Sequence, residues 1–340
     1  MKFEFDPSGS RVAVWTPAKV NLFFEILGKR ADGYHEIETV VAPIDLYDRL
    51  EFIRTDVPGL TVEAFDGEGR PDPDVPCDES NLIAKAYRVF IDEYPDFAEK
   101  SGYACKVVKK IPTKAGLGGG SSDAAAALAV FSRLRAVPLS KERLQELAGR
   151  VGSDGPLFFE DGASVGRGRG ELVEPIECPS LWLTVVKPVD GLSTAAVYGR
   201  YASASSHGPQ KSLDEFCAGV RRAAELARSA LSLSEEERTA RLDSVRLEIA
   251  QTVARKIANR LEEPADAMWS GFERRRELLR STGALGVQIS GSGSALFAIY
   301  PDERSAKHAA EEARRAIEDP ASDLRGDRVY AVRTLSSLVL

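Results

Sequence analysis

The chain has 340 residues, of which 43% are hydrophobic and 29% are charged, and its formal net charge is −7. This balance predicts a globular, soluble protein with room for two domains of ordinary size. The acidic charge argues against non-specific binding to nucleic acid, and no apolar run is long enough to span a bilayer. Because residues 1–6 also lack the pattern of a signal peptide, we expect a cytoplasmic protein with neither a membrane nor a nucleic-acid partner.

The first apolar segment, residues 12–27, is rich enough in β-branched residues to predict one or two strands, broken at Thr16-Pro17. Lys19 interrupts this segment. Its ammonium group either reaches water at a sheet edge or points into a functional cleft. A polar turn follows and ends with Tyr34 and His35. This pair suits stacking and hydrogen bonding to a planar ring, although it is also common in ordinary loops.

A glycine-rich stretch, Gly116-Leu-Gly-Gly-Gly-Ser-Ser122, follows a strand predicted over residues 103–110 and opens an alanine-rich helix that should reach Leu134. Glycines at a helix start let a ligand approach the backbone closely, and the first-turn N–H groups form a seat for phosphate. Ser121 and Ser122 would cap the helix or donate to phosphate oxygens. The spacing fits neither the P-loop nor the dinucleotide fingerprint. A glycine-rich hinge before a packed helix remains the alternative.

Other elements are expected on both sides of this loop. Strands are predicted at 48–54 and 60–64, an exposed loop at 66–77, and a helix capped by Ser80 at 81–94. Ser140 starts a helix over 141–151, which ends at Gly152-Ser-Asp-Gly-Pro156. Asp154 in this segment either forms the turn or presents a carboxylate to a cleft.

The C-terminal half begins with a strand over 181–186 and a helix that starts at Ser193. Helical periodicity predicts two or three helices between 213 and 261 and a further helix over 266–280. Residues 286–300 are typical of a strand, a glycine and serine turn, and a second strand. With a helix over 303–317 and a strand over 328–334 they form a split β–α–β pattern.

Three segments, in this order, resemble the GHMP kinases, which are small-molecule kinases with their own phosphate loop. They are Pro17-Ala-Lys-Val-Asn-Leu-Phe23, Gly116-Leu-Gly-Gly-Gly-Ser-Ser-Asp123 and Ser290-Gly-Ser-Gly-Ser294. Within this superfamily the chain is most similar to the kinases of the non-mevalonate isoprenoid pathway that act on a cytidine-diphosphate derivative of methylerythritol. The specific matches are the triple-glycine loop, Arg30-Ala-Asp-Gly-Tyr-His35, Gly152-Ser-Asp-Gly-Pro156 and Gly166-Arg-Gly-Arg-Gly-Glu171.

The resemblance implies an α+β, two-domain GHMP kinase fold. Residues 1–178 would form an ATP-binding domain similar to ribosomal protein S5 domain 2. Residues 179–340 would form a ferredoxin-like, split β-α-β domain that helps to hold the substrate. The helical segment over 213–258 is longer than the family's norm, which marks it as an insertion. A monomer and a homodimer both fit this pattern.

The resemblance also implies the roles of single residues. Asp154 would be the general base that accepts the proton of the substrate's C2 hydroxyl, and Lys19 would keep Asp154 ionised and neutralise transition-state charge. ATP would bind with Mg²⁺, which Ser122 would contact. Lys109 would neighbour the nucleotide, with a solvated surface lysine as the alternative. The residues implied for the ATP phosphates are Gly116, Leu117, Gly118, Gly119, Gly120, Ser121 and Ser122.

For the substrate, the resemblance implies a cytosine pocket made by Tyr34 and His35, with Tyr198 as a second stacking ring. Asn21 and Thr194 correspond to further substrate contacts. These rings argue against another small alcohol such as mevalonate or homoserine, since neither offers a ring to stack.

One position near the expected base departs from the family's pattern. Gly155 stands where the family usually has Val, and we expect it to loosen the backbone next to Asp154. This glycine keeps open a second alternative, a non-catalytic nucleotide-binding paralogue.

Overall fold

The computed structural model describes residues 1–340 except 8–9, 101, 136, 205–207 and 320–321. Its described residues form an eight-stranded sheet and a four-stranded sheet, each accompanied by helices, which confirms the α+β class. The larger sheet contains β1 (Lys2–Phe5), β2 (Arg11–Lys29), β3 (His35–Thr55), β4 (Leu60–Phe65), β5 (Gly102–Val108), β6 (Ser164–Gly168), β7 (Leu172–Pro175) and β9 (Ala258–Asn259). The smaller sheet contains β8 (Trp182–Lys187), β10 (Gly286–Ile289), β11 (Leu296–Tyr300) and β12 (Arg328–Arg333).

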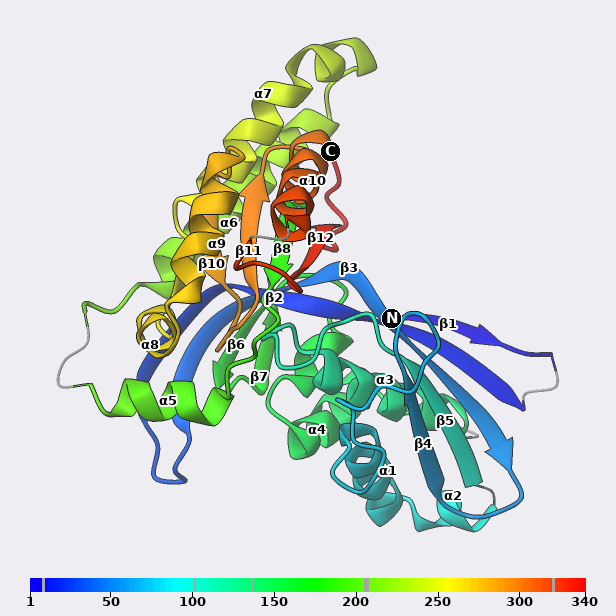
Figure 1. The fold of residues 1–340 in the computed structure, drawn as a ribbon. Helices are drawn as coiled ribbons and strands as arrows, with labels where there is room; N and C mark the ends of the chain where they lie inside the picture. The colour runs from blue at the N-terminus through cyan, green and yellow to red at the C-terminus, as the bar shows by residue number, and fades with distance from the viewer. Residues whose placement is uncertain (8–9, 101, 136, 205–207, 320–321) are drawn as a thin grey trace.

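The long strands β2 and β3 form the backbone of the larger sheet, and Figure 1 shows them passing beneath the smaller sheet. They pair antiparallel along almost their whole length, with register shifts at three places, one of them between Pro17 and Ala18. The break predicted at Thr16-Pro17 is therefore wrong, because the chain absorbs the proline in an irregularity within one strand. The strand predicted at 48–54 is the end of β3, which already begins at His35.

Helices α1 (Leu82–Glu93), α2 (Pro95–Lys100), α3 (Gly119–Arg133) and α4 (Lys141–Val151) accompany the larger sheet. Helix α3 is buried from Ser122 to Ser132, and its alanines let neighbouring elements approach it closely. The predicted caps are confirmed in one case and wrong in another. Ser140 caps α4, whereas the side chain of Asn81, not that of Ser80, accepts the N–H of Ile83 at the start of α1.

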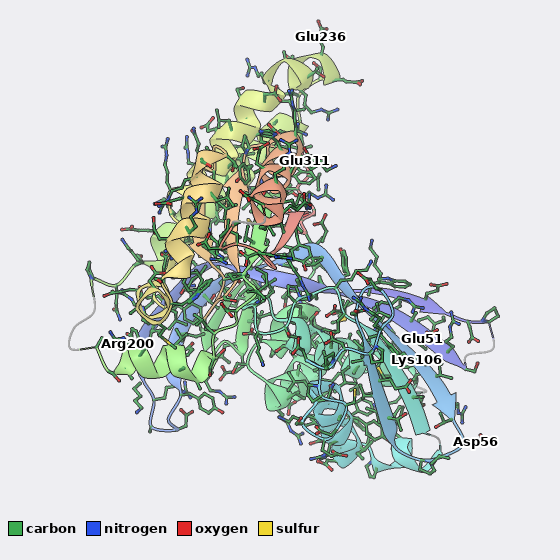
Figure 2. All side chains as sticks on the ribbon, viewed as in Figure 1. Glu51, Asp56, Lys106, Arg200, Glu236 and Glu311 are labelled. Atoms are coloured by element: carbon green, nitrogen blue, oxygen red, sulfur yellow. The ribbon has the colours of Figure 1, made fainter. Side chains whose placement is uncertain are left out.

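The smaller sheet is accompanied by α5 (Thr194–Ala202), α6 (Leu213–Leu231), α7 (Glu235–Ala254), α8 (Glu262–Met268), α9 (Gly271–Ser281) and α10 (Glu303–Glu318). Helices α6 and α7 form a hairpin whose tip lies far from the larger sheet (Figure 1). Figure 2 shows Glu236 at this tip and Glu311 on α10 pointing outward, and both are exposed. The single helix predicted over 266–280 is wrong, because the extended backbone of Trp269 separates α8 from α9.

The two sheets are joined by more than one crossing of the chain. The smaller sheet takes all its strands from residue 182 onward, yet β9 returns to the larger sheet and pairs parallel with β2. The division into residues 1–178 and 179–340 stays a prediction. Among the described helices, none is both long enough and apolar enough to cross a membrane.

Candidate active site

A cavity of about 430 Å³ lies where β2, the glycine-rich loop and the turn after β10 come together. Among the predicted site residues, Ser122, Tyr34 and His35 do not line it, and all the others do. Its lining comprises Lys19, Asn21, Phe24, Leu82, Lys109, residues 111–121, Asp154, Thr194, Tyr198, Leu261, Gly291 and Ser292.

The glycine-rich loop is clamped between β2 and the turn of residues 290–294. On one side, the N–H of Lys19 donates to the carbonyl oxygen of Leu117 at 3.0 Å. On the other side, the N–H of Ala295 donates to the carbonyl oxygen of Ala115, also at 3.0 Å. Gly116 has a φ of 71°, and a Cβ at this position would lie 1.9 Å from the carbonyl oxygen of Ser290. Only glycine therefore permits this approach.

Helix α3 begins at the loop with Gly118 as its N-cap, and no side chain among the described residues caps it. The predicted capping by Ser121 or Ser122 is therefore wrong. Both the first-turn N–H groups and the positive end of the helix dipole lie beside the cavity, since Gly119, Gly120 and Ser121 line it. This is the arrangement that binds phosphate at a helix N-terminus.

Lys19 and Asp154 meet in the cavity although they are distant in sequence. The Nζ atom of Lys19 lies 3.5 Å from Oδ2 of Asp154 and donates to Oδ1 of Asn21 at 2.6 Å. Lys19 is 4% exposed, whereas the Asp154 side chain is 40% exposed. A buried ammonium group is costly unless it is paired and hydrogen-bonded. The two partners meet this need while leaving the carboxylate accessible from the cavity.

Gly155 follows Asp154 and begins a short 3₁₀ helix, Gly155–Phe159. A Cβ at Gly155 would lie 2.9 Å from the carbonyl oxygen of Ala148 and 3.0 Å from its Cβ. The expectation that this glycine loosens the backbone is not supported. Gly155 is buried, and its small size lets α4 pack directly against the segment that carries Asp154.

Lys109 is not a solvated surface lysine, because it is buried between two carboxylates. Its Nζ donates to Asp123 at 2.6 Å and to Asp48. Asp48 also accepts the N–H groups of Lys110 and Ile111 at 2.6 and 2.8 Å. Asp48 and Asp123, both bound to Lys109, thus tie the segment that enters the loop to the N-terminal part of α3. This network is not predicted from the sequence, since nothing local marks Asp48 as a partner of Lys109.

Two pKa values in this network are raised, for different reasons. Burial alone would lower the pKa of Lys109, but Asp123 and Asp48 raise it above its ordinary value. Burial raises the pKa of Asp123 to about 7, opposed by Lys109 and reinforced by Asp48. Two carboxylates therefore share one ammonium group, and the carboxyl group of Asp123 keeps its proton to a higher pH than an ordinary aspartate does.

Ser122 is directed away from the cavity. Its hydroxyl is fully buried and donates to the carbonyl oxygen of Pro17 at 2.6 Å. This geometry does not favour the Mg²⁺ contact expected of it. Among the described residues that line the cavity, Asp154 carries the only carboxylate. No group of three or more His, Cys, Asp or Glu within the described part of the chain is placed to hold a metal ion.

Aromatic rings gather beside the cavity. The ring centroid of His35 lies 5.1 Å from that of Tyr198 and 5.9 Å from that of Tyr201. Burial lowers the pKa of His35, with a contribution from Lys29, so the imidazole is neutral near pH 7. A neutral imidazole has one donor and one acceptor nitrogen. The predicted pair of His35 and Tyr198 is thus together in space.

Tyr34 contacts a different partner from the ring pair of His35 and Tyr198. It is 55% exposed, and the guanidinium of Arg169 lies 4.9 Å from its ring centroid. Thr194 lines the cavity, and its hydroxyl shares a hydrogen bond of 2.8 Å with the hydroxyl of Ser292, another lining residue.

The turn after β10 has no role predicted from the sequence, although its glycine and serine repeat over 290–294 is one of the family motifs. The hydroxyl of Ser290 donates to the carbonyl oxygen of Gly116 at 2.9 Å and accepts the N–H of Asn21 at 3.2 Å. The turn therefore contacts both the loop and β2. The apolar lining residues Phe24, Leu82 and Leu261 were also missed, because nothing in sequence separates them from core residues.

Two family models match this chain. The model described as "GHMP kinases N terminal domain" matches residues 81–159, and "GHMP kinases C terminal" matches residues 246–319. A 4-diphosphocytidyl-2-C-methyl-D-erythritol kinase of Pelotomaculum thermopropionicum is 33% identical over 88% of this chain and 93% of its own length. The protein of the same name from Exiguobacterium sibiricum is 34% identical over 95% of this chain and 98% of its own length.

Solved structures show the same fold. A crystal structure of 4-(cytidine 5'-diphospho)-2C-methyl-D-erythritol kinase has a TM-score of 0.70 and 27% identity, covering 94% of this chain and 98% of its own. A homoserine kinase from Cytophaga hutchinsonii, at 17% identity, has a TM-score of 0.67 and covers 98% of each chain. At this low identity, the homoserine kinase shows a shared fold alone.

Proposed function

This chain belongs to the GHMP kinases and, among them, to the 4-diphosphocytidyl-2-C-methyl-D-erythritol kinase family, and we propose that it phosphorylates 4-diphosphocytidyl-2-C-methyl-D-erythritol with ATP. The γ-phosphoryl group would pass to the C2 hydroxyl of this alcohol, in the non-mevalonate route to isoprenoid precursors. The observation that carries the proposal is the 3.5 Å approach of Lys19 to Asp154 in a cavity walled by the glycine-rich loop.

The glycine-rich loop would hold the phosphates of ATP. Its backbone N–H groups at the start of α3 and the helix dipole favour anions, and the clamp between β2 and the turn at 290–294 keeps them in place. Holding the donor rigidly makes the transfer effectively intramolecular, and such positioning acts together with electrostatic stabilisation to accelerate phosphoryl transfer. Lys109 would border the nucleotide from its buried position beside the loop.

Asp154 would take the proton from the attacking hydroxyl. Its carboxylate is exposed to the cavity, so a substrate oxygen has room to come within hydrogen-bond reach. Lys19, whose Nζ lies 3.5 Å from this carboxylate, would oppose the negative charge on the transferred phosphoryl group. Asn21 orients Lys19 through the bond to its Nζ, and Thr39 in turn binds the Asn21 amide at 2.9 Å.

We propose that Mg²⁺ enters with ATP, held by the phosphate oxygens of the nucleotide rather than by Ser122. Magnesium in kinases keeps several waters and takes few protein ligands, which agrees with a cavity lining that offers a single carboxylate. When bound, the ion would neutralise phosphate charge. The cytosine of the substrate would stack on Tyr198 and meet His35 and Tyr34, although only Tyr198 of these three lines the cavity.

The proposal is tested by measuring ADP formation from ATP and Mg²⁺ with three alcohols in separate reactions. These are 4-diphosphocytidyl-2-C-methyl-D-erythritol, mevalonate and homoserine, and a reaction without alcohol measures background ATP hydrolysis. We expect turnover with the first alcohol alone. Turnover with mevalonate or homoserine instead would reject the proposed substrate, and no turnover with any alcohol, despite ATP binding, would reject the proposed activity.

A further inference from the structure

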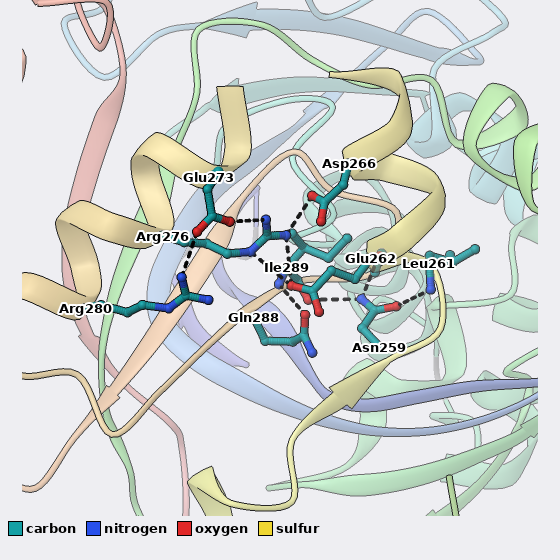
Figure 3. A network of polar contacts seen from close by, with 10 residues as sticks. Asn259, Leu261, Glu262, Asp266, Glu273, Arg276, Arg280, Gln288 and Ile289 are labelled. Atoms are coloured by element: carbon teal, nitrogen blue, oxygen red, sulfur yellow. Dashed lines mark hydrogen bonds and ion pairs between the residues drawn. The ribbon is translucent and has the colours of Figure 1, made fainter. Parts of the chain in front are cut away.

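Asn259 lies at the junction of the two sheets. It belongs to β9, which pairs parallel with β2 through Phe23 and Phe24, so its backbone is part of the larger sheet. Its side chain extends to the end of β10 in the smaller sheet, as Figure 3 shows beside Ile289. Asn259 is 8% exposed and does not line the cavity.

All the bonding atoms of the Asn259 amide group are used. Nδ2 donates to the carbonyl oxygens of Ile289 at 3.0 Å and Gly291 at 2.8 Å, and Oδ1 accepts the N–H of Leu261 at 2.9 Å. Leu261 and Gly291 line the cavity, and Ile289 lies two residues before Gly291 at the end of β10. Buried backbone groups that lose their partners carry a large penalty, so this pattern holds the local backbone in one arrangement.

Gly291, which Asn259 holds, packs directly on the residues proposed to act in catalysis. An ideal Cβ position at Gly291 lies 3.2 Å from Oδ1 of Asn21 and 3.5 Å from Nζ of Lys19. The neighbouring Ser290 binds the backbone of both Asn21 and Gly116. A displacement of this turn would therefore reach Lys19 and the glycine-rich loop together.

The surroundings of Asn259 are fixed by ion pairs. Arg260 forms a two-bond pair with the buried carboxylate of Glu25 on β2. On the other side, Arg276 of α9 binds Glu262 at 2.9 Å and Asp266 at 2.7 Å, both on α8, as Figure 3 shows. These contacts hold the chain on both sides of Asn259, so the amide approaches the turn from a rigid support.

We propose that Asn259 is a positioning residue for phosphoryl transfer, which sets the place of Lys19 by holding the turn at Gly291. This inference rests on the proposed function and adds to it a residue outside the cavity. Because a misplacement of about 1 Å in a catalytic group can reduce turnover about 100-fold, the effect should appear in kcat more than in KM.

The test compares Asn259→Ala and Asn259→Asp with the wild-type chain. Asp has nearly the shape of Asn and keeps an acceptor for Leu261, but its carboxylate lacks both donors for the turn. We expect both variants to reduce kcat about 10- to 100-fold. Hydrogen exchange followed by mass spectrometry should also become faster in peptides that contain residues 290–294. Thr184→Val is the control, since Thr184 is fully buried in β8 and donates to the carbonyl oxygen of Ala306, away from the cavity.

A second arm separates positioning from general loss of stability. In a Lys19→Ala background, Asn259→Ala should reduce the residual turnover only slightly, because the group that it positions is already absent. Wild-type kcat in Asn259→Asp, unchanged exchange of the turn, or full additivity with Lys19→Ala would each overturn the inference. If the wild-type chain shows no turnover, the proposed function alone is rejected, and the exchange measurement still decides whether Asn259 holds the turn.

Discussion

Lys19 on β2 and Asp154 before the 3₁₀ helix face each other with 3.5 Å between Nζ and Oδ2. The lysine is buried and the carboxylate is partly open to the cavity. The pair therefore combines a fixed positive charge with an accessible proton acceptor.

Asp154→Asn should reduce kcat about 100-fold or more, because the amide cannot take up the proton of the attacking hydroxyl. The free energy of unfolding should change by less than about 1 kcal/mol, since the Asp154 side chain is 40% exposed. Steady-state kinetics and urea unfolding measure the two effects. Asp92→Asn, an exposed position on α1, is the control and should leave both unchanged. A wild-type kcat in Asp154→Asn would assign the base elsewhere.

Gly155→Ala should lower the free energy of unfolding by about 1–3 kcal/mol, because its Cβ would lie 2.9 Å from the carbonyl oxygen of Ala148. Turnover should fall as well, since the displaced segment carries Asp154. Gly152→Ala is a close control, because Gly152 has extended backbone and no atom lies within 4 Å of its Cβ position. Equal stability of the two variants in urea unfolding would show that α4 is not tightly packed at Gly155.

Asp123 should make the chain less stable as pH rises from about 4 to about 7. Burial raises the pKa of Asp123 to about 7 in the folded chain, against a reference value of 3.8. The folded state therefore binds this proton more tightly than the unfolded state. Its stabilising contribution is complete below the unfolded pKa and is lost as pH rises through the folded value.

Asp123→Asn should flatten the dependence of the unfolding free energy on pH over this window, because the amide does not titrate. Urea unfolding at several pH values measures it, with Asp92→Asn as the control. Burial raises the pKa of Asp123, and of the charged neighbours Lys109 opposes this shift while Asp48 reinforces it. A slope identical to that of the wild-type chain would show that the shared proton is not held by Asp123.

Tyr198→Leu should raise the KM for the cytidine-bearing alcohol roughly 5- to 30-fold, the loss of one base–aromatic stack. The KM for ATP should stay the same, because the glycine-rich loop does not depend on this ring, and it serves as the internal control. Steady-state kinetics with each substrate varied in turn measures both values. An unchanged KM for the alcohol would remove Tyr198 from the proposed cytosine pocket.

Much of the fold follows from local patterns. Ser140 before an amphipathic segment predicted the start of α4 correctly, and the glycine and alanine pattern predicted α3. The predictions failed where long-range contacts overrule such signals. Pro17 was expected to break a strand, but pairing with β3 carries the strand through it.

The order of the motifs and the glycine-rich loop at the start of a helix were determined by the sequence alone, because a phosphate seat of this kind depends on neighbouring residues. Only the tertiary structure decided which residues meet: Lys19 with Asp154, Lys109 with Asp48 and Asp123, and Asn259 with the turn at Gly291. These contacts join segments that are far apart in the chain. They arise from strand register and close packing, which no local pattern of residues encodes.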